Sequence, residues 1–234
     1  MSQEIYNTYV DNAFGGQRKM ANFKISEFYY NYLKYFPKNK ETPILDIGVG
    51  RGEMLKVMKD NKYAHYKGID ISPSTVTFCQ DQKLNCELIE DTQKWLTEHR
   101  NSFGVITLLD VLEHIPRDQS INFLKSIKKS LLQDGKVIIQ VPNLQSPDGQ
   151  LHRYNDFTHE SGFVEHSLEQ ILLVAGFKNI SFSGFETFVE PNVKNLTKRC
   201  LRYLYWKYVR FIRRISGNLS PEILHPVFYV VAQP

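Results

Sequence analysis

Short apolar runs alternate with helical patterns along most of the chain. Each run is rich in aliphatic and β-branched residues and is bounded by turn residues, which is typical of buried strands. The first five runs are residues 43–47, 65–71, 85–90, 103–110 and 135–142. The fifth is apolar without alternation, as expected for a strand covered on both faces of a parallel sheet. The pattern predicts a doubly wound α/β sheet.

Two further strands, over residues 178–186 and 225–232, complete a predicted seven-stranded, mostly parallel sheet of Rossmann-like type. Residues 1–40 have a polar and aromatic helical pattern with a turn at residues 14–16. We expect them to form a helical cap over the end of the first strand. The predicted organisation is this N-terminal cap followed by one domain over residues 41–234.

Helical spacing predicts the elements between the strands. They are residues 54–58, a helix from Pro73, a helix through Trp95 and Leu96, residues 119–132 and residues 168–175. Ser167 would cap the start of the last helix, and Gly176 would end it.

Composition is that of an ordinary globular protein. The 234 residues are 42% hydrophobic and 23% charged, enough to bury a full core in one domain. No run approaches the roughly 20 apolar residues of a membrane span, and the first ten residues lack the features of a signal peptide. We therefore expect a cytoplasmic protein. Cys79, Cys86 and Cys200 form no C-x-x-C pair, so we expect buried thiols without a disulfide or zinc site.

The net charge of +4 hides an asymmetry. Residues 194–214 carry eight lysines or arginines and no acid, and subtracting these charges leaves −4 for the rest. This distribution argues against a nucleic-acid partner. Residues 194–216 also have the 3–4 apolar spacing of an amphipathic helix. Such a helix either lies on the body with a solvated basic rim or contacts a membrane surface or a lipid-linked substrate.

Three glycines follow the first strand in the stretch PILDIGVGRGE. Gly48, Gly50 and Gly52 lie between strand and helix, where glycine lets the backbone approach a ligand closely. A dinucleotide-binding turn has the pattern G-x-G-x-x-G, but here Glu53 has the place of the last glycine. Asp46 precedes the turn, where its carboxylate would repel a diphosphate and attract a cationic ligand.

The stretch ILDIGVGRG therefore resembles the first motif of the class I S-adenosylmethionine-dependent methyltransferases. Their cofactor carries an ammonium and a sulfonium but no phosphate, which suits an acidic turn better than NAD does. The sequence DVLEHI after the fourth strand resembles a motif of ubiquinone-biosynthesis and related small-molecule methyltransferases. The resemblance implies the methyltransferase fold, S-adenosyl-L-methionine as cofactor, and cofactor contacts from Asp46, Gly48, Gly50 and Gly52.

Acids at the ends of the next strands are further candidates for cofactor binding. Asp70, followed by Ile71, ends the second strand roughly 20 residues beyond the glycines, where such folds bond the ribose hydroxyls. Asp70 could instead cap the next helix, although Ser72 is the better cap. The resemblance places Asp91 and Thr92 near the adenine, while Asp91 equally suits a helix cap.

The resemblance also implies contacts around the methionine part of the cofactor. Leu109 and Asp110, at the end of the fourth strand, would lie beside it. His114 of DVLEHI would lie close to the methyl group. An imidazole at this position could equally hold its own loop in place.

Residues 143–166 break the alternation, and we expect a long irregular loop with a functional role. The sequence HRYNDFTHE is similar to the substrate loop of methyltransferases found with bacterial surface-polysaccharide genes. NAFGGQRKM is similar to the N-terminal lid of the same proteins, which commonly have an arginine where Gly15 stands here. The resemblance implies that the acceptor is a sugar hydroxyl of a cell-surface glycan or its precursor.

A hydroxyl acceptor must lose a proton, and a general base contributes about 10²–10⁴-fold to the rate. His159 is the preferred base because Asp156 and Glu160 could orient its ring. His152, Asp156 and His114 are further candidates, and each of these side chains could instead only brace the loop. A divalent ion could also bind to the insert through His152, Asp156, His159 and Glu160, but an irregular loop fixes no ligand geometry, so we expect no metal.

Two alternatives stay open. DVLEHI suggests a small aromatic or quinone-type acceptor in place of a sugar. The chain could also be a non-catalytic binding module that keeps the cofactor fold and docks through its basic helix.

Overall fold

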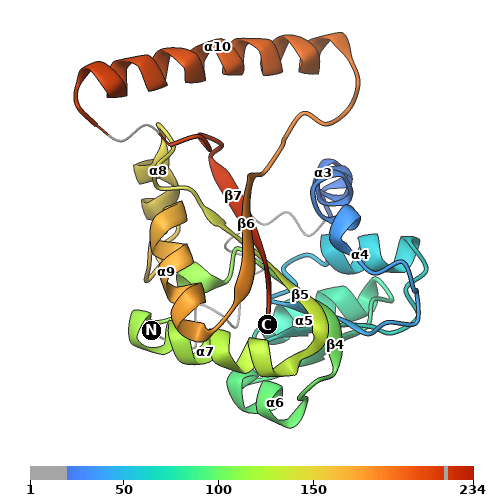
Figure 1. The fold of residues 1–234 in the computed structure, drawn as a ribbon. Coiled ribbons are helices and arrows are strands. Elements are labelled where there is room, and N and C mark those ends of the chain that lie inside the picture. Colours follow the sequence, from blue (N-terminus) through green and yellow to red (C-terminus); the bar gives the residue numbers. More distant parts are fainter. Residues whose placement is uncertain (1–19, 219–220) are drawn as a thin grey trace.

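The structure, a computed structural model, describes residues 20–218 and 221–234. Its centre is a seven-stranded sheet in the order β3-β2-β1-β4-β5-β7-β6 (Figure 1). The strands are β1 (Ile44–Ile47), β2 (Tyr66–Asp70), β3 (Cys86–Leu88), β4 (Phe103–Leu109), β5 (Leu131–Pro142), β6 (Lys178–Gly184) and β7 (Val227–Gln233). The first five run parallel, and β7 is antiparallel to both of its neighbours. The predicted mostly parallel, seven-stranded sheet is confirmed.

Helices cover both faces of this sheet. The helices of the described residues are α3 (Asn22–Tyr32), α4 (Glu53–Asp60), α5 (Pro73–Asp81), α6 (Thr92–Glu98), α7 (Arg117–Ser130), α8 (Gly149–Tyr154), α9 (Glu165–Ala175) and α10 (Val193–Ile215). Helix α10 stands apart from the sheet (Figure 1). Two 3₁₀ turns, η1 (Leu33–Tyr35) and η2 (Leu112–His114), follow α3 and β4. None of the helices in the described part of the chain is long and apolar enough to cross a membrane.

Successive side chains of each strand point to opposite faces of the sheet, which divides the core into two layers. Leu45 and Ile106 point to the side of α6, α7 and α9, whereas their neighbours Ile44 and Val105 point to the side of α3, α4 and α5. All four residues of β1 are buried. A central parallel strand with helices on both faces has no solvated side, which is why β1 is apolar without alternation apart from Asp46.

Several boundaries differ from the sequence prediction. The insert 143–166 is not wholly irregular, because α8 lies within it. Its polar sequence has no apolar period from which a short helix could be predicted. The helix expected over 168–175 begins earlier, at Glu165, so Ser167 is its third residue and not its cap. The Ser167 hydroxyl still accepts a hydrogen bond from the N–H of Val164 (3.1 Å).

Other predictions concern the ends of the chain and its thiols. Helix α3 lies where the helical cap was expected, but residues 1–19, with the predicted turn at 14–16, lie outside the described residues. Cys79 and Cys86 are buried as expected, whereas Cys200 is exposed on α10. The prediction of a buried thiol is therefore wrong for Cys200, because no residue of α10 is buried by the described chain.

Candidate functional site

A cavity of about 660 Å³ opens at the carboxyl ends of β1, β2 and β4. Residues 46–51, 69–72 and 109–111 form its floor. Lys24 and Phe28 of α3 line one side, and residues of the 143–166 insert line the other. Ligand sites of doubly wound sheets lie at this edge, where the strand order reverses on either side of the first strand.

The glycine turn is shaped by contacts that allow no side chain. Gly48 has φ +74°, and a Cβ there would lie 2.3 Å from Cγ2 of Val111. Gly52 has φ +78°, and its Cβ would lie 2.6 Å from Cδ1 of Leu84. Gly48 and Gly50 line the cavity, whereas Gly52 packs the turn against the segment before β3 and does not line it. Two of the three glycines therefore face the ligand space.

Asp46 combines burial with exposure to the cavity. Its side chain lines the cavity, and its Oδ1 accepts a hydrogen bond from the Thr107 hydroxyl (2.6 Å). Burial raises the pKa of Asp46 to about 8, against the lowering effect of this hydrogen bond and with a smaller contribution from the charge of Asp70. The carboxyl group is therefore protonated at neutral pH until a positive charge arrives, because a nearby cation favours the ionised form.

Asp70 lines the same cavity at the end of β2. Burial raises its pKa to about 6, although backbone N–H groups at residues 49, 50, 71 and 72 hydrogen-bond it and oppose the rise. The adjacent helix α5 is capped by Ser72, which accepts from the N–H of Thr75 (3.3 Å). Asp70 is therefore not the helix cap, and its carboxylate lies between the glycine turn and the rest of the cavity floor.

The remaining predicted cofactor residues separate into two groups. Ile71, Thr92 and Leu109 line the cavity. Asp91 does not: it caps α6 by accepting from the N–H of Lys94 (2.8 Å). The proposed adenine contact of Asp91 stays a prediction, since the side chain would have to leave this cap.

Asp110 is held in an unusual conformation at the end of β4. Its φ is +55°, which is uncommon for a residue with a side chain. Oδ2 accepts from Nε2 of Gln140 (2.7 Å), and Oε1 of Gln140 accepts from the Tyr32 hydroxyl. Oδ1 is buried without a hydrogen-bond partner in the part of the chain that the structure describes. A strained backbone that presents an unsatisfied oxygen to a cavity suggests a ligand with a donor group.

These features fit S-adenosyl-L-methionine. Asp46 and Asp110 offer carboxylate oxygens to a cationic group, and Asp70 offers one to hydroxyl groups. Gly48 leaves room for close approach of the backbone. The floor of the cavity therefore has the donor and acceptor pattern that this cofactor requires.

His114 is fixed by a chain of hydrogen bonds from the insert. The Thr158 hydroxyl donates to Oδ1 of Asp156 (2.6 Å) and lies 2.8 Å from Nδ1 of His114. Since the hydroxyl has one proton, it accepts from the Nδ1–H of the histidine. Burial, and then the charge of His159, lower the pKa of His114. The geometry therefore favours a neutral imidazole whose Nε2 is an acceptor.

His159 is oriented by a backbone carbonyl, and the expected partners Asp156 and Glu160 do not hold its ring. Its Nδ1 lies 3.3 Å from the carbonyl oxygen of Arg153, which can only accept. Its Nε2 lies 3.9 Å from Oε1 of Glu113. The rings of His114 and His159 are 4.8 Å apart. The structure thus brings together two of the predicted histidines and one acid that the sequence analysis missed.

Glu113 is buried, with 1% of its surface exposed. Burial, and then the charge of Asp110, raise the pKa of Glu113 well above its usual value. Glu113 is part of the DVLEHI motif, so the sequence did mark this stretch. Nothing in the motif predicts that the Glu113 side chain faces residue 159. His152 and Asp156 also line the cavity, at its outer part. Burial would raise the Asp156 pKa, but its hydrogen bonds from Thr158 keep it low.

Comparisons with known proteins agree with this geometry. The chain is 31% identical over 146 residues to a phosphoethanolamine N-methyltransferase of Triticum aestivum, which covers 58% of this chain and 28% of that protein. It is 26% identical over 118 residues to a ubiquinone biosynthesis O-methyltransferase of Neisseria meningitidis, which covers 47% of each. The chain thus spans less than half the length of either relative.

A solved structure shares the fold across the whole chain. The crystal structure of a SAM-dependent methyltransferase from Archaeoglobus fulgidus superposes with a TM-score of 0.72, covering 98% of this chain and 100% of that one, at 21% identity. A family model described as a methyltransferase domain matches residues 18–182. The chain therefore belongs to the methyltransferase domain family and shares the fold of a SAM-dependent methyltransferase of known structure.

Proposed function

We propose that the protein transfers a methyl group from S-adenosyl-L-methionine to a hydroxyl oxygen of a sugar, in a cell-surface glycan or its precursor. The observation that supports this acceptor is the polar outer part of the cavity. It is lined by Lys24, His152, Asn155, Asp156 and Glu160. Such side chains can hydrogen-bond several hydroxyl groups of a sugar ring, whereas a quinone would require an apolar pocket.

Two exposed aromatic side chains are next to lining residues of the insert in the sequence. Tyr154 and Phe157 adjoin Asn155 and Asp156 in the insert, and they are 78% and 89% exposed. Exposed aromatic faces beside hydrogen-bonding groups suit a ligand that is polar at its rim and apolar on its ring face, as a sugar is. The insert therefore offers both kinds of contact from one short segment.

The residues of the chain supply positioning and proton removal. When bound, the cofactor supplies an activated methyl group on a sulfonium leaving group. Asp46, Asp70 and Asp110 orient it at the floor of the cavity, and the insert holds the acceptor hydroxyl above it. We assign removal of the hydroxyl proton to the group around Glu113 and His159, which lines the cavity.

The relatives suggest a different acceptor. Their names would predict the amine of phosphoethanolamine or the phenol of a ubiquinone precursor. Both matches span less than half of those proteins, and neither covers two thirds of this chain. A phenol is the second candidate because Phe123, Ile115 and Val111 provide an apolar wall in the same cavity.

Transfer of a labelled methyl group to a panel of acceptors tests the proposal. The panel contains sugars and lipid-linked or nucleotide-linked glycans, catechol-type phenols and phosphoethanolamine, and mass spectrometry detects the gain of one methyl. We expect a methylated sugar, with KM raised at least about fivefold by Tyr154→Ala or Phe157→Ala. Tyr30→Ala is the control, since Tyr30 is an exposed tyrosine that lies on α3, outside the insert. Methylation of a phenol or amine but of no sugar contradicts the acceptor, and failure to bind the cofactor contradicts the enzyme.

A further inference from the structure

Glu113, His114 and His159 form a cluster of metal-ligand type at one side of the cavity. One ligand atom of each residue lies within 4.8 Å of those of the other two. The residues come from distant parts of the sequence, η2 and the insert. The backbone N–H groups of Glu160 and Ser161 donate to the carbonyl oxygen of Glu113 (2.8 and 3.0 Å), which fixes the insert against η2.

The hydrogen bonds of both histidines leave acceptor atoms inside the cluster. His159 donates its Nδ1–H to the carbonyl of Arg153, so the Nε2 of the neutral ring is an acceptor directed at Glu113, 3.9 Å away. His114 donates its Nδ1–H to the Thr158 hydroxyl, so its Nε2 is also an acceptor. A histidine whose second nitrogen donates to a carbonyl or hydroxyl is the usual arrangement of a metal ligand.

Glu113 adds a carboxylate to these two acceptors. Neither of its oxygens has a hydrogen-bond partner among the described residues, although both are buried. A buried carboxylate that faces imidazole lone pairs requires a proton or a cation between them. The Glu113 carboxylate therefore faces the two histidines without a hydrogen-bond donor among the described residues.

We propose that Glu113, His114 and His159 bind a divalent first-row transition-metal ion, for which we had expected no site. Two histidines and one carboxylate suit Zn²⁺, Mn²⁺, Co²⁺ or Fe²⁺ and leave coordination positions open. With bonds of about 2.0–2.1 Å, tetrahedral ligand atoms lie about 3.3 Å apart, so these side chains need to close by less than about 1.5 Å. All three residues line the cavity, so an oxygen of the acceptor can reach a metal ion bound to them.

This set differs from the one considered from the sequence. His152, Asp156 and Glu160 are not in the cluster, and only His159 is common to both sets. Asp156 instead supports the site indirectly, since it accepts from the Thr158 hydroxyl that holds His114. Hydrogen-bonded groups of this kind orient metal ligands and typically change metal affinity 10–100-fold.

Titration of the EDTA-treated protein with Co²⁺ tests the metal site independently of any acceptor. We expect one equivalent to bind and to give visible absorption bands of a Co²⁺ ion with nitrogen and oxygen ligands. Glu113→Gln and His159→Ala should each weaken binding at least about tenfold. His166→Ala is the control, because His166 is an exposed histidine on α9 outside the cluster. Circular dichroism verifies that each variant is folded.

Absence of one-to-one Co²⁺ binding would overturn the proposal and favour a proton shared between Glu113 and His159. Binding that survives both substitutions would overturn it as well. Both results are independent of the acceptor panel, because they do not require activity.

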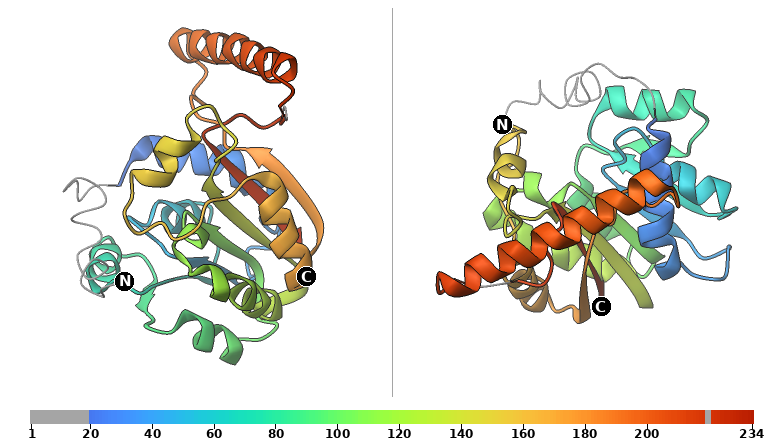
Figure 2. Two further views of the ribbon diagram at one scale, coloured as in Figure 1. Left: turned by 90° about the vertical axis from the view of Figure 1, so that its left-hand side faces the viewer. Right: turned by 90° about the horizontal axis from the view of Figure 1, so that it is seen from above.

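Helix α10 provides a second and separate observation. None of its 23 residues is buried by the described chain. It lies as an isolated rod above the end of the sheet, apart from the other helices (Figures 1 and 2). The question is which side of the helix faces the protein.

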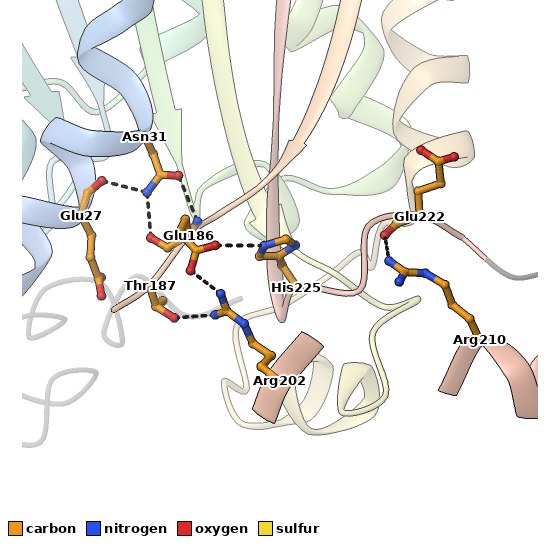
Figure 3. A network of polar contacts seen from close by, with 8 residues as sticks. All are labelled: Glu27, Asn31, Glu186, Thr187, Arg202, Arg210, Glu222 and His225. Carbon is orange, nitrogen blue, oxygen red and sulfur yellow. Dashed lines mark hydrogen bonds and ion pairs between the residues drawn. The ribbon is translucent and has the colours of Figure 1, made fainter. Parts of the chain in front are cut away.

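The polar side of α10 faces the body. Arg202 bonds Glu186 and the Thr187 hydroxyl, and the carbonyl of Glu222 accepts from Arg210 (Figure 3). The ring of Trp206 contacts His225, with centroids 4.4 Å apart. Arg213 donates to the carbonyl oxygen of Gln145 (2.9 Å). Residues 202, 206, 210 and 213 lie on one face of a helix.

The apolar side therefore faces away from the body. Its large residues are 59–66% exposed: Leu201, Leu204, Tyr208, Phe211 and Ile215. At 3.6 residues per turn, their mean direction is roughly 180° from that of the body-facing residues. A surface helix normally buries its apolar face against the core, so the reversed orientation requires an external partner.

We propose that this face of α10 lies on an anionic membrane surface. Residues 194–214 contain eight basic residues and no acid. Lys194, Lys207 and Arg214 border the apolar face and can reach lipid headgroups, while the tyrosines suit the interface. A second copy of α10 fits less well, since pairing two such helices would bring cations together without any acid to compensate.

Co-sedimentation with lipid vesicles tests this surface. We expect binding to vesicles that contain phosphatidylglycerol and at least about tenfold weaker binding to phosphatidylcholine alone, because each basic residue near the headgroups contributes about fivefold. The double variant Leu204→Gln with Phe211→Gln should reduce binding at least about tenfold. Leu173→Gln is the control, since Leu173 on α9 is 57% exposed, as Leu204 is 60% exposed.

Equal binding to both vesicles, or unchanged binding of the double variant, would overturn the membrane proposal. A dimer that sedimentation detects and that the double variant abolishes would overturn it in favour of a second copy. Circular dichroism of the double variant excludes unfolding as the cause of weaker binding.

Discussion

The substitution Asp46→Asn is expected to stabilise the protein and to weaken cofactor binding. Asp46 is 2% exposed, and burial raises its pKa to about 8. Asparagine has the same shape, carries no charge, and can still accept the hydrogen bond from the Thr107 hydroxyl. The variant therefore removes the ionisable group and leaves the packing unchanged.

The size of the effect follows from the two pKa values of Asp46. In the unfolded chain the pKa is 3.8, and in the folded protein it is about 8. Between these values the unfolded chain has lost the proton that the folded protein retains. In this range the free energy of unfolding therefore falls by about 1.4 kcal/mol for each unit by which the pH rises. At pH 7 the accumulated cost is about 4 kcal/mol, which is the largest gain that asparagine can give.

Thermal unfolding at several pH values measures this difference. For a chain of this size about 1 kcal/mol corresponds to 2–4 °C, so the variant should melt up to roughly 8–16 °C higher at pH 7. The difference should vanish below about pH 3, where Asp46 is protonated in both the folded and the unfolded wild type. The cofactor should raise the Tm of the wild type more than that of the variant. Its affinity for the wild type should increase with pH up to about 8, because the cation favours ionised Asp46.

Two results would refute this reasoning. A variant that is no more stable than the wild type at pH 7 would mean that Asp46 is ionised and compensated in the folded protein. A variant that binds the cofactor as tightly as the wild type would mean that the charge of Asp46 does not contribute to binding. Comparing the two proteins at each pH removes the contribution of all other titrating groups.

Three further predictions concern the same cavity. Gly48→Ala should lower the Tm by several degrees and weaken cofactor binding. Gly217→Ala is the control: its φ is +70°, but a Cβ added there has no described atom within 4 Å, so it should cost only roughly 1 kcal/mol of backbone strain. Equal losses of Tm in the two variants would contradict the steric argument. Asp70→Ala should weaken cofactor binding at least about tenfold in calorimetry, and unchanged affinity of the folded variant would remove Asp70 from the site. The Tm should also fall, because backbone N–H groups at residues 49, 50, 71 and 72 lose their acceptor. Thr158→Val should lower kcat at least about tenfold without changing cofactor affinity, since it releases His114; a wild-type kcat would show that the hydrogen bond is dispensable.

The sequence by itself determined the sheet and the glycine turn. Apolar runs such as residues 43–47 and 135–142 are strands because a parallel strand between two helical layers has only buried positions. Gly48 and Gly176 were predictable because positive φ angles strongly favour glycine. The strands and the glycine turns depend on residues that are close in the sequence, so the local sequence pattern is enough to predict them.

The tertiary structure alone decided which distant side chains meet. Glu113 faces His159 because the insert folds back on η2 through backbone hydrogen bonds, which no residue type specifies. The outward apolar face of α10 depends on the arginine contacts on its other side, and periodicity gives amphipathicity but not direction. The raised pKa of Asp46 likewise follows from complete burial, because desolvation depends on everything packed around a group and not on its place in the chain.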